Sequence, residues 1–216
     1  MSLQQNKQQG LIEQELYIVR HGETDLNRSQ IVQGRGVDTS LNENGIRQAH
    51  AFFNHFGDTP FDIIFTSQLQ RTHQTMQPFV DKGYKLNIFA ELDEIDWGIH
   101  EGRVTSADMK SEYQLIVNRW NEGYLNEKIP GGESPLELQA RQKDFINNIL
   151  PQYSGKILIC MHGRAMRSFI CTLLNKPLVH MDDYPHQNLS LYKLNRIEGI
   201  YNIEFFNYLE HLNGKD

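Results

Sequence analysis

Short apolar runs alternate with amphipathic stretches along the chain. Short apolar runs are typical of buried strands, and stretches with an apolar residue every three or four positions are typical of helices. The runs predict six strands, at residues 16–19, 61–65, 86–89, 156–161, 189–194 and 200–206. Because a polar turn of residues 195–199 joins the last two, we expect a hairpin there and one antiparallel strand.

Helices are expected between these strands. Residues 40–43 read as a capping box, and Ile46, Ala49, Phe53 and Phe56 follow at helical spacing. Ser134, Pro135 and Glu137 mark a second helix start. Further helices are expected at 69–80, which Pro78 would kink or end, at 106–122 and at 165–174. The alternation predicts an α/β fold, a three-layer α/β/α sandwich around a mostly parallel sheet of about six strands with one antiparallel.

Composition narrows this picture to one domain over residues 1–216. The chain is 39% hydrophobic and 22% charged, the balance of an ordinary globular protein. Within the domain, residues 1–14 and 211–216 are expected to be flexible, and residues 102–132 to form an inserted subregion that covers the substrate. No apolar segment resembles a signal peptide or a membrane span, so a cytoplasmic protein is expected. The net charge of −6 favours neither nucleic acid nor an anionic membrane as partner.

Two histidine–glycine pairs stand where predicted strands end. Arg20, His21 and Gly22 follow residues 16–19, and His162 and Gly163 follow residues 156–161. Ligands of parallel α/β folds bind at the carboxyl ends of strands, and a helix start after Gly163 would favour an anion. A single histidine at a strand end is as often an ordinary surface residue, but two such pairs together favour a functional site.

Arginines and acids near the same strand ends fit phosphate chemistry. Arg20 adjoins His21, and Arg71 lies one turn into the helix after residues 61–65; guanidinium groups bind two phosphate oxygens at once. A departing alkoxide needs an acid to protonate it. Four acids lie in one loop, and their spacing does not choose among them: Glu91, Asp93, Glu94 and Asp96.

Taken in order, these motifs resemble the histidine phosphatase superfamily, also called phosphoglycerate mutase-like, over about residues 16–194. The motifs are Arg20-His-Gly-Glu-Thr followed by Asn27, Ser67-x-Leu-x-Arg71-Thr, Leu-x-Glu94 before Trp-Gly and Glu-Gly, and His162-Gly. The resemblance implies a phosphoglycerate mutase-like fold and a phosphatase that needs neither metal nor cofactor. His21 would accept the phosphoryl group and Glu94 would supply the proton.

The resemblance also implies the residues that hold the substrate. Arg20, Arg71 and a protonated His162 would bind the phosphoryl oxygens. The further substrate-binding residues would be Asn27, Gly22, Gln33, Gly34, Gly163 and Arg103. The stretch of residues 132–134, together with Arg141, resembles the Gly-Glu-Ser stretch of the phosphatase branches. The expected ligand is a small phosphorylated metabolite.

Other phosphatase classes fit the sequence poorly. A cysteine phosphatase requires Cys-x5-Arg, but the residue six positions after Cys160 is Met166, and the residue six positions after Cys171 is Pro177. The Asp-x-Asp of aspartyl-phosphate hydrolases, the Asp-x-His of binuclear metal enzymes and the GxxxxGK[ST] loop of nucleotide kinases do not occur.

Within the family, a phosphoglycerate mutase remains the main alternative, followed by an inactive binding module. Mutases of this family carry a longer, basic insertion between the positions of Glu94 and His162, and this stretch is compact here, which favours a hydrolase. Residues 92–96 also resemble fructose-2,6-bisphosphatases, although Gly163 departs from the glutamine found there. This favours a sugar phosphate weakly. Arg35, Arg103 and Arg164 are candidates to bind a second phosphate or a carboxylate.

Overall fold

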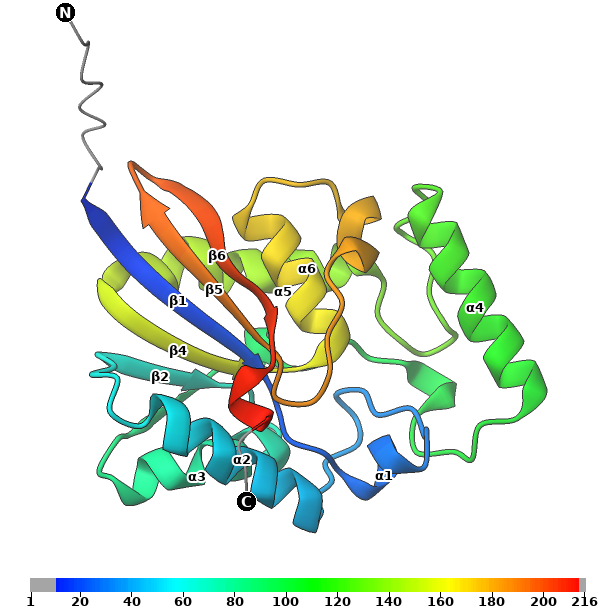
Figure 1. Cartoon of the computed structure of the whole chain (residues 1–216). Coiled ribbons are helices and arrows are strands. Elements are labelled where there is room, and N and C mark those ends of the chain that lie inside the picture. Colours follow the sequence, from blue (N-terminus) through cyan, green and yellow to red (C-terminus); the bar gives the residue numbers. More distant parts are fainter. Residues whose placement is uncertain (1–10, 214–216) are drawn as a thin grey trace, which may run out of the picture.

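A six-stranded sheet with helices on both faces organises the computed structural model, which describes residues 11–213 (Figure 1). The strand order is β3-β2-β4-β1-β5-β6. The strands are β1 (Ile12–Arg20), β2 (Ile63–Thr66), β3 (Leu86–Ile88), β4 (Gly155–Met161), β5 (Leu191–Ile197) and β6 (Ile200–Tyr208). Strand β5 is antiparallel to both of its neighbours, and the other pairings are parallel. The predicted mixed sheet with one antiparallel strand is confirmed.

Within the described part of the chain, six α-helices and several short helical turns connect the strands. The α-helices are α1 (Asp25–Arg28), α2 (Glu43–Phe56), α3 (Gln70–Asp81), α4 (Ala107–Asn121), α5 (Pro135–Asp144) and α6 (Gly163–Leu173). The turns are η1 (Ala90–Leu92), η2 (Gly98–His100), the π-turn η3 (Phe145–Ile149), η4 (Leu150–Gln152), η5 (Leu178–Asp183) and η6 (Glu210–Leu212). In Figure 1, α4 stands apart from the layers that pack directly on the sheet.

The core has two layers, one on each face of the sheet. Along β1, Leu16 and Ile18 face the layer that contains α5 and α6, and Tyr17 and Val19 face the layer that contains α2 and α3. Strands covered on both faces need apolar residues at consecutive positions, because neither face meets water. This explains why the central strands read as unbroken apolar runs.

Helix α2 begins two residues later than the predicted capping box. Asn42 is its N-cap, with a side chain that accepts from the backbone N–H of Gly45 at 2.8 Å, while the hydroxyl of Ser40 donates to Gln70. The expected buried face also shifts. Ile46 is 48% exposed, and the fully buried aromatic ring is Phe52.

The structure also differs from the expectations that Pro78 would kink or end its helix and that residues 12–14 and His211 would be flexible. Pro78 lies inside α3, which continues to Asp81. Residues 12–14 belong to β1, where the buried side chain of Gln14 donates to the carbonyls of Leu150 and Tyr153. His211, expected to fray, is buried. The expectations for residues 1–10 and 214–216 lie outside the described residues. Across residues 11–213, every helix is too short or too polar to cross a membrane.

Candidate active site

The two histidine–glycine pairs meet at the carboxyl ends of β1 and β4. These strands pair in parallel, with Arg20 beside Met161, so the residues that follow each strand leave the sheet side by side. The ring centroids of His21 and His162 are 5.1 Å apart. The structure therefore brings together two residues that are 141 positions apart in the sequence (162 − 21).

The ring of His21 has one defined hydrogen-bonding arrangement. Its Nδ1 lies 2.7 Å from the carbonyl oxygen of Gly22, and because a carbonyl only accepts, Nδ1 carries the proton and Nε2 keeps a lone pair. Burial lowers the pKa of His21 well below 6.5, and the charges of Arg71 and Arg20 lower it further. His21 is therefore neutral near pH 7 and can act as a nucleophile at Nε2.

His162 is also neutral, which differs from the protonated form expected from the sequence. The Nε of Arg71 lies 3.2 Å from Nδ1 of His162, and since a guanidinium only donates, Nδ1 accepts. Nε2 lies 2.7 Å from the hydroxyl of Ser67. Burial, followed by the charges of Arg71 and His21, lowers the pKa of His162 well below 6.5. Both ring nitrogens are engaged within the protein.

The two predicted phosphate arginines hold different positions. Arg71 is fully buried, and its Nη1 and Nη2 donate to the carbonyls of Val37 at 2.7 Å and Gly34 at 3.2 Å. The Nη1 of Arg20 lies 3.3 Å from Nδ1 of His186, and its buried Nε meets no acceptor within residues 11–213. Burial lowers the pKa of Arg20 to about 10, so the guanidinium stays charged near pH 7.

A cavity of ≈ 280 Å³ opens beside His21. Its lining comes from the end of β1, from α1 and the loop after it, from the Glu94 loop, from α4 and α6, and from the loop before β5. Six predicted site residues line it: Arg20, His21, Asn27, Gln33, Glu94 and Gly163. Five other predicted residues are outside the lining: Gly22, Gly34, Arg71, His162 and Arg103.

Of the predicted site residues outside the cavity lining, two glycines pack closely against other parts of the chain and Arg103 is exposed. A Cβ on Gly22 would lie 2.7 Å from the carbonyl oxygen of Gly45, so Gly22 lets the strand end approach α2. A Cβ on Gly34 would overlap the carboxylate of Glu101. Arg103 is exposed. The sequence-based assignment of Arg103 to substrate binding therefore has no support from its position.

Of the four acids that the sequence left open, Glu94 alone lines the cavity. Its Oε1 accepts from the backbone N–H groups of Ile95 at 2.9 Å and Ala165 at 2.8 Å, and its Oε2 accepts from that of Arg164 at 3.1 Å. The carboxylate thus occupies the N-terminus of α6, where we expected a phosphate, and the helix dipole favours negative charge there. Because each oxygen has two lone pairs, Oε2 retains one that can hold a proton.

Among the cavity residues that the sequence did not assign are Arg167, His186 and Tyr113. Arg164 and Arg167 both donate through Nη1 to Oδ1 of Asp182, and Nη2 of Arg164 donates to the hydroxyl of Tyr113 at 3.2 Å. Their spacing of three residues places both arginines on one face of α6, a signal that helical periodicity could have supplied. His186 follows no strand and belongs to no motif.

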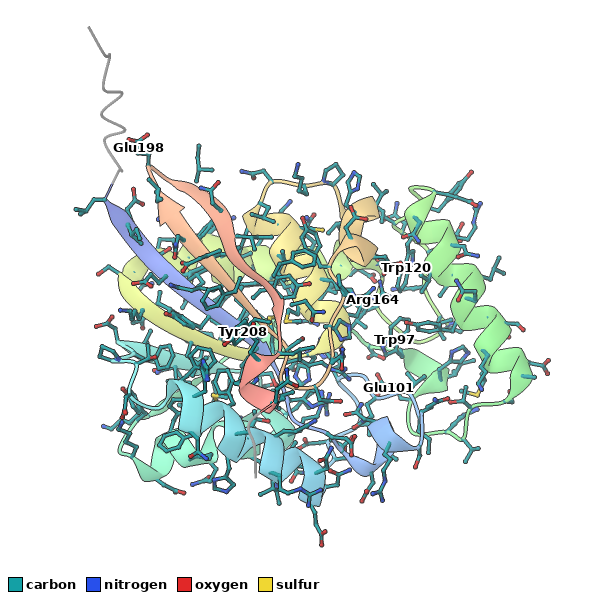
Figure 2. All side chains as sticks on the ribbon, in the orientation of Figure 1. Trp97, Glu101, Trp120, Arg164, Glu198 and Tyr208 are labelled. Atoms are coloured by element: carbon teal, nitrogen blue, oxygen red, sulfur yellow. The ribbon has the colours of Figure 1, made fainter. Side chains whose placement is uncertain are left out.

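Aromatic rings lie between Arg164 and helix α4. Trp97 and Trp120 stack with centroids 5.6 Å apart, and the guanidinium of Arg164 lies 5.6 Å from the Trp120 ring. Figure 2 shows the three side chains together between α6 and α4. The described residues contain no group of three His, Cys, Asp or Glu side chains that could hold a metal ion.

Comparison with known proteins settles the family. The model of the histidine phosphatase superfamily (branch 1) matches residues 16–208. The chain belongs to this superfamily. The match agrees with the resemblance found in the sequence motifs, and it covers every residue that lines the cavity.

The superfamily relatives of this chain include phosphatases and mutases. Mouse fructose-2,6-bisphosphatase TIGAR is 34% identical over 146 residues, which are 65% of this chain and 52% of that protein, so the match spans about half of TIGAR. The probable phosphoglycerate mutase GpmB of Yersinia pestis is 34% identical over 165 residues, 76% of each chain. The crystal structure of the α-ribazole phosphatase from Shigella flexneri has a TM-score of 0.79 at 24% identity and covers 90% of this chain and 96% of its own. That likeness shows the shared fold.

Proposed function

We propose that this protein hydrolyses a phosphate monoester by taking the phosphoryl group onto Nε2 of His21 and passing it to water. One observation carries the proposal: Nδ1 of His21 is fixed on the Gly22 carbonyl, so the lone pair of Nε2 belongs to a ring that lines a cationic cavity. The substrate class is a small phosphorylated metabolite, with sugar phosphates as the first group to assay.

In the first step, Nε2 of His21 attacks phosphorus and the bond from phosphorus to the ester oxygen breaks. Oε2 of Glu94 gives a proton to the departing oxygen, so the metabolite leaves as an alcohol. The guanidinium of Arg20, whose buried Nε has no acceptor within residues 11–213, stabilises the phosphoryl oxygens. The charge of Arg71, close to both histidines, acts in the same direction.

In the second step, water attacks the phosphorus on His21 and the phosphorus–nitrogen bond breaks. The Glu94 carboxylate takes a proton from that water, which restores its acid form, and inorganic phosphate leaves. Nε2 of His21 regains its lone pair. No charge from a metal ion enters either step, because arginines supply it.

The mutase is the second candidate, because the GpmB relative matches 76% of this chain. The two reactions share the phosphohistidine and differ in the acceptor, water or a second substrate hydroxyl. The compact stretch between Glu94 and His162 supports the hydrolase. An inactive binding module is less favoured, because the nucleophile, the acid and Arg20 all line one cavity.

A trapping experiment tests the proposal. Wild type is incubated in EDTA with ³²P-labelled sugar phosphates and quenched in base, and we expect acid-labile, base-stable label on His21. His21→Ala should carry no label and lose activity by at least about 10³-fold, since it removes the nucleophile. A mutase assay with the bisphosphate primer runs in parallel.

Cys160→Ser serves as the control. Cys160 is fully buried and burial raises the pKa of its thiol, so its removal should leave labelling unchanged. Label on Cys160, full activity in His21→Ala, or an EDTA loss that zinc or magnesium restores would each contradict the proposed mechanism.

A further inference from the structure

His186 lies in the loop between η5 and β5, and the sequence motifs leave it without a role. Its side chain nevertheless lines the cavity together with Arg20, His21 and Gly163. We propose that His186 is a phosphate-binding residue that donates its Nε2–H to an oxygen of the bound phosphoryl group. This inference rests on the proposed function, because it names a further ligand of the same phosphoryl group.

The hydrogen bond with Arg20 fixes which nitrogen of His186 carries the proton. Nη1 of Arg20 lies 3.3 Å from Nδ1 of His186, and because a guanidinium only donates, Nδ1 accepts. A neutral imidazole then carries its proton on Nε2. Burial, followed by the charges of Arg20, Arg167 and Arg164, lowers the pKa of His186 to about 2, so the ring presents an N–H and no charge. Within residues 11–213, this N–H has no acceptor at hydrogen-bonding distance.

The position of the ring points to the phosphoryl group as the ligand. A Cβ on Gly163 would lie 2.5 Å from Cε1, 2.8 Å from Nε2 and 3.4 Å from Nδ1 of His186, so the Cε1 side of the ring packs on Gly163 at the start of α6. Arg20, which donates to Nδ1 of His186, is also the arginine whose buried Nε lacks an acceptor within the described residues. The Arg20 guanidinium and the Nε2–H of His186 belong to residues that line the cavity together with His21, and such donors favour an anionic oxygen there.

His162 provides the contrast. The sequence assigned it to the phosphoryl oxygens, yet Arg71 and Ser67 engage its two nitrogens and it is outside the cavity lining. Of the two histidines near His21, the one in the cavity lining is His186. The donor expected from the second histidine–glycine pair is therefore supplied from the loop before β5.

Inhibition by inorganic phosphate tests this assignment, because phosphate has no leaving group. His186→Phe keeps an aromatic ring over Gly163 and removes the N–H. Loss of a hydrogen bond to a charged group should raise the inhibition constant of phosphate and the KM of nitrophenyl phosphate by roughly ten- to a hundredfold. His186→Gln, whose amide supplies an N–H, should recover most of the affinity.

His180→Phe and His180→Gln are the matched controls, since His180 lies half-exposed in η5 and bonds to Asp183. Both should leave the phosphate inhibition constant unchanged. An unchanged constant in His186→Phe would overturn the inference. So would a rise in the KM of a sugar phosphate alone, because His186 would then contact the rest of the substrate.

A measurement on wild type keeps the inference testable if His186→Phe does not fold. Titration with inorganic phosphate should move the imidazole ¹H–¹⁵N signals of His186, assigned through His186→Gln, and leave those of His180 in place. Signals of His186 that do not move would overturn the inference. The trapping experiment separates the two proposals: wild type that binds phosphate through His186 yet forms no phosphohistidine would contradict the proposed function alone.

Discussion

At the residue scale, the partners of each histidine decide what the ring can do. A carbonyl holds Nδ1 of His21 and leaves a lone pair on Nε2, whereas a guanidinium and a hydroxyl hold the two nitrogens of His162. Both rings are buried and neutral, yet His21 alone combines a place in the cavity lining with an uncommitted lone pair. The proposal of His21 as the nucleophile therefore rests on hydrogen-bond donors and acceptors more than on burial or charge.

The proposed role of Glu94 as the proton donor gives the first prediction at this scale. Glu94→Gln removes the acid, so transfer from an alkyl phosphate, whose alkoxide leaves poorly, should fall about 10²- to 10⁴-fold. Nitrophenolate leaves without a proton, so the rate of the first phosphoryl-transfer step from nitrophenyl phosphate should fall less than about tenfold. Stopped-flow measurements should also show a burst of nitrophenolate followed by a slow steady rate, because water then lacks its base.

Asp96→Asn is the control for that prediction. Asp96 lies in the same loop, accepts from the N–H of Gly98 at 2.7 Å and stays outside the cavity lining. Asparagine keeps the accepting oxygen, so both substrates should react as in wild type. A leaving-group asymmetry in Asp96→Asn, with equal losses for both substrates in Glu94→Gln, would move the acid to Asp96.

At the element scale, helix α5 holds the loop that carries Glu94. Nη1 of Arg141 donates to the carbonyls of Ala90 and Glu91, and Nη2 donates to those of Asp93 and Glu94, both at 2.9 Å. An ion pair between Arg141 and Glu133 at 2.8 Å fixes the guanidinium. The position of the Glu94 carboxylate therefore depends on a side chain from a helix on one face of the sheet.

Arg141→Lys tests this dependence. Lysine keeps the charge opposite Glu133 but cannot reach four carbonyls with one ammonium group. We expect a loss of about 1–3 kcal/mol in the free energy of unfolding, since carbonyls lose donors. The kcat for an alkyl phosphate should fall at least about tenfold, and that for nitrophenyl phosphate should fall less. Lys143→Ala, an exposed change on the same helix, should alter neither.

Element boundaries were predictable where local hydrogen bonds decide them. The Ser134–Glu137 capping box and Pro135 at the first turn of α5 appear as the sequence indicates. The hairpin is present too, but β5 extends to Ile197 and leaves Glu198 and Gly199 as a two-residue turn, both with positive φ. At α2 the observed cap, Asn42, stands two residues after the predicted one, because the hydroxyl of Ser40 bonds to Gln70, a tertiary contact that the local sequence does not indicate.

At the scale of the whole molecule, the site residues that the sequence could predict are those that directly follow the ends of strands. Parallel pairing of β1 and β4 requires His21 and His162 to meet, so the motif positions suffice. The rest of the cavity wall depends on how α4 and the loop before β5 fold back over α6, which brings in Tyr113 and His186. Such packing leaves no local signal in the sequence, and this explains why these residues were not assigned.

The stability of the whole molecule should depend on His211, a buried histidine outside the cavity lining. His211 packs against the rings of Phe52, Phe56 and Tyr208 with centroids 5.2, 5.7 and 5.7 Å away. Burial lowers the pKa of His211 to about 4. An unfolded histidine has a pKa near 6.5, so below that pH the unfolded chain binds a proton that the folded protein excludes. Folding stability should therefore fall as the pH drops from about 6.5 towards 4.

His211→Phe isolates this contribution, because it keeps an aromatic ring in the cluster and removes the titrating group. Urea unfolding at pH 7 and pH 5 should show that wild type loses about 1–2 kcal/mol more between the two values than His211→Phe does. The other buried histidines contribute equally to both proteins and cancel in the difference. His180→Phe, which replaces a half-exposed histidine, should follow wild type. If His211→Phe loses as much stability as wild type, then His211 takes up its proton without unfolding and the aromatic cluster does not exclude the charge.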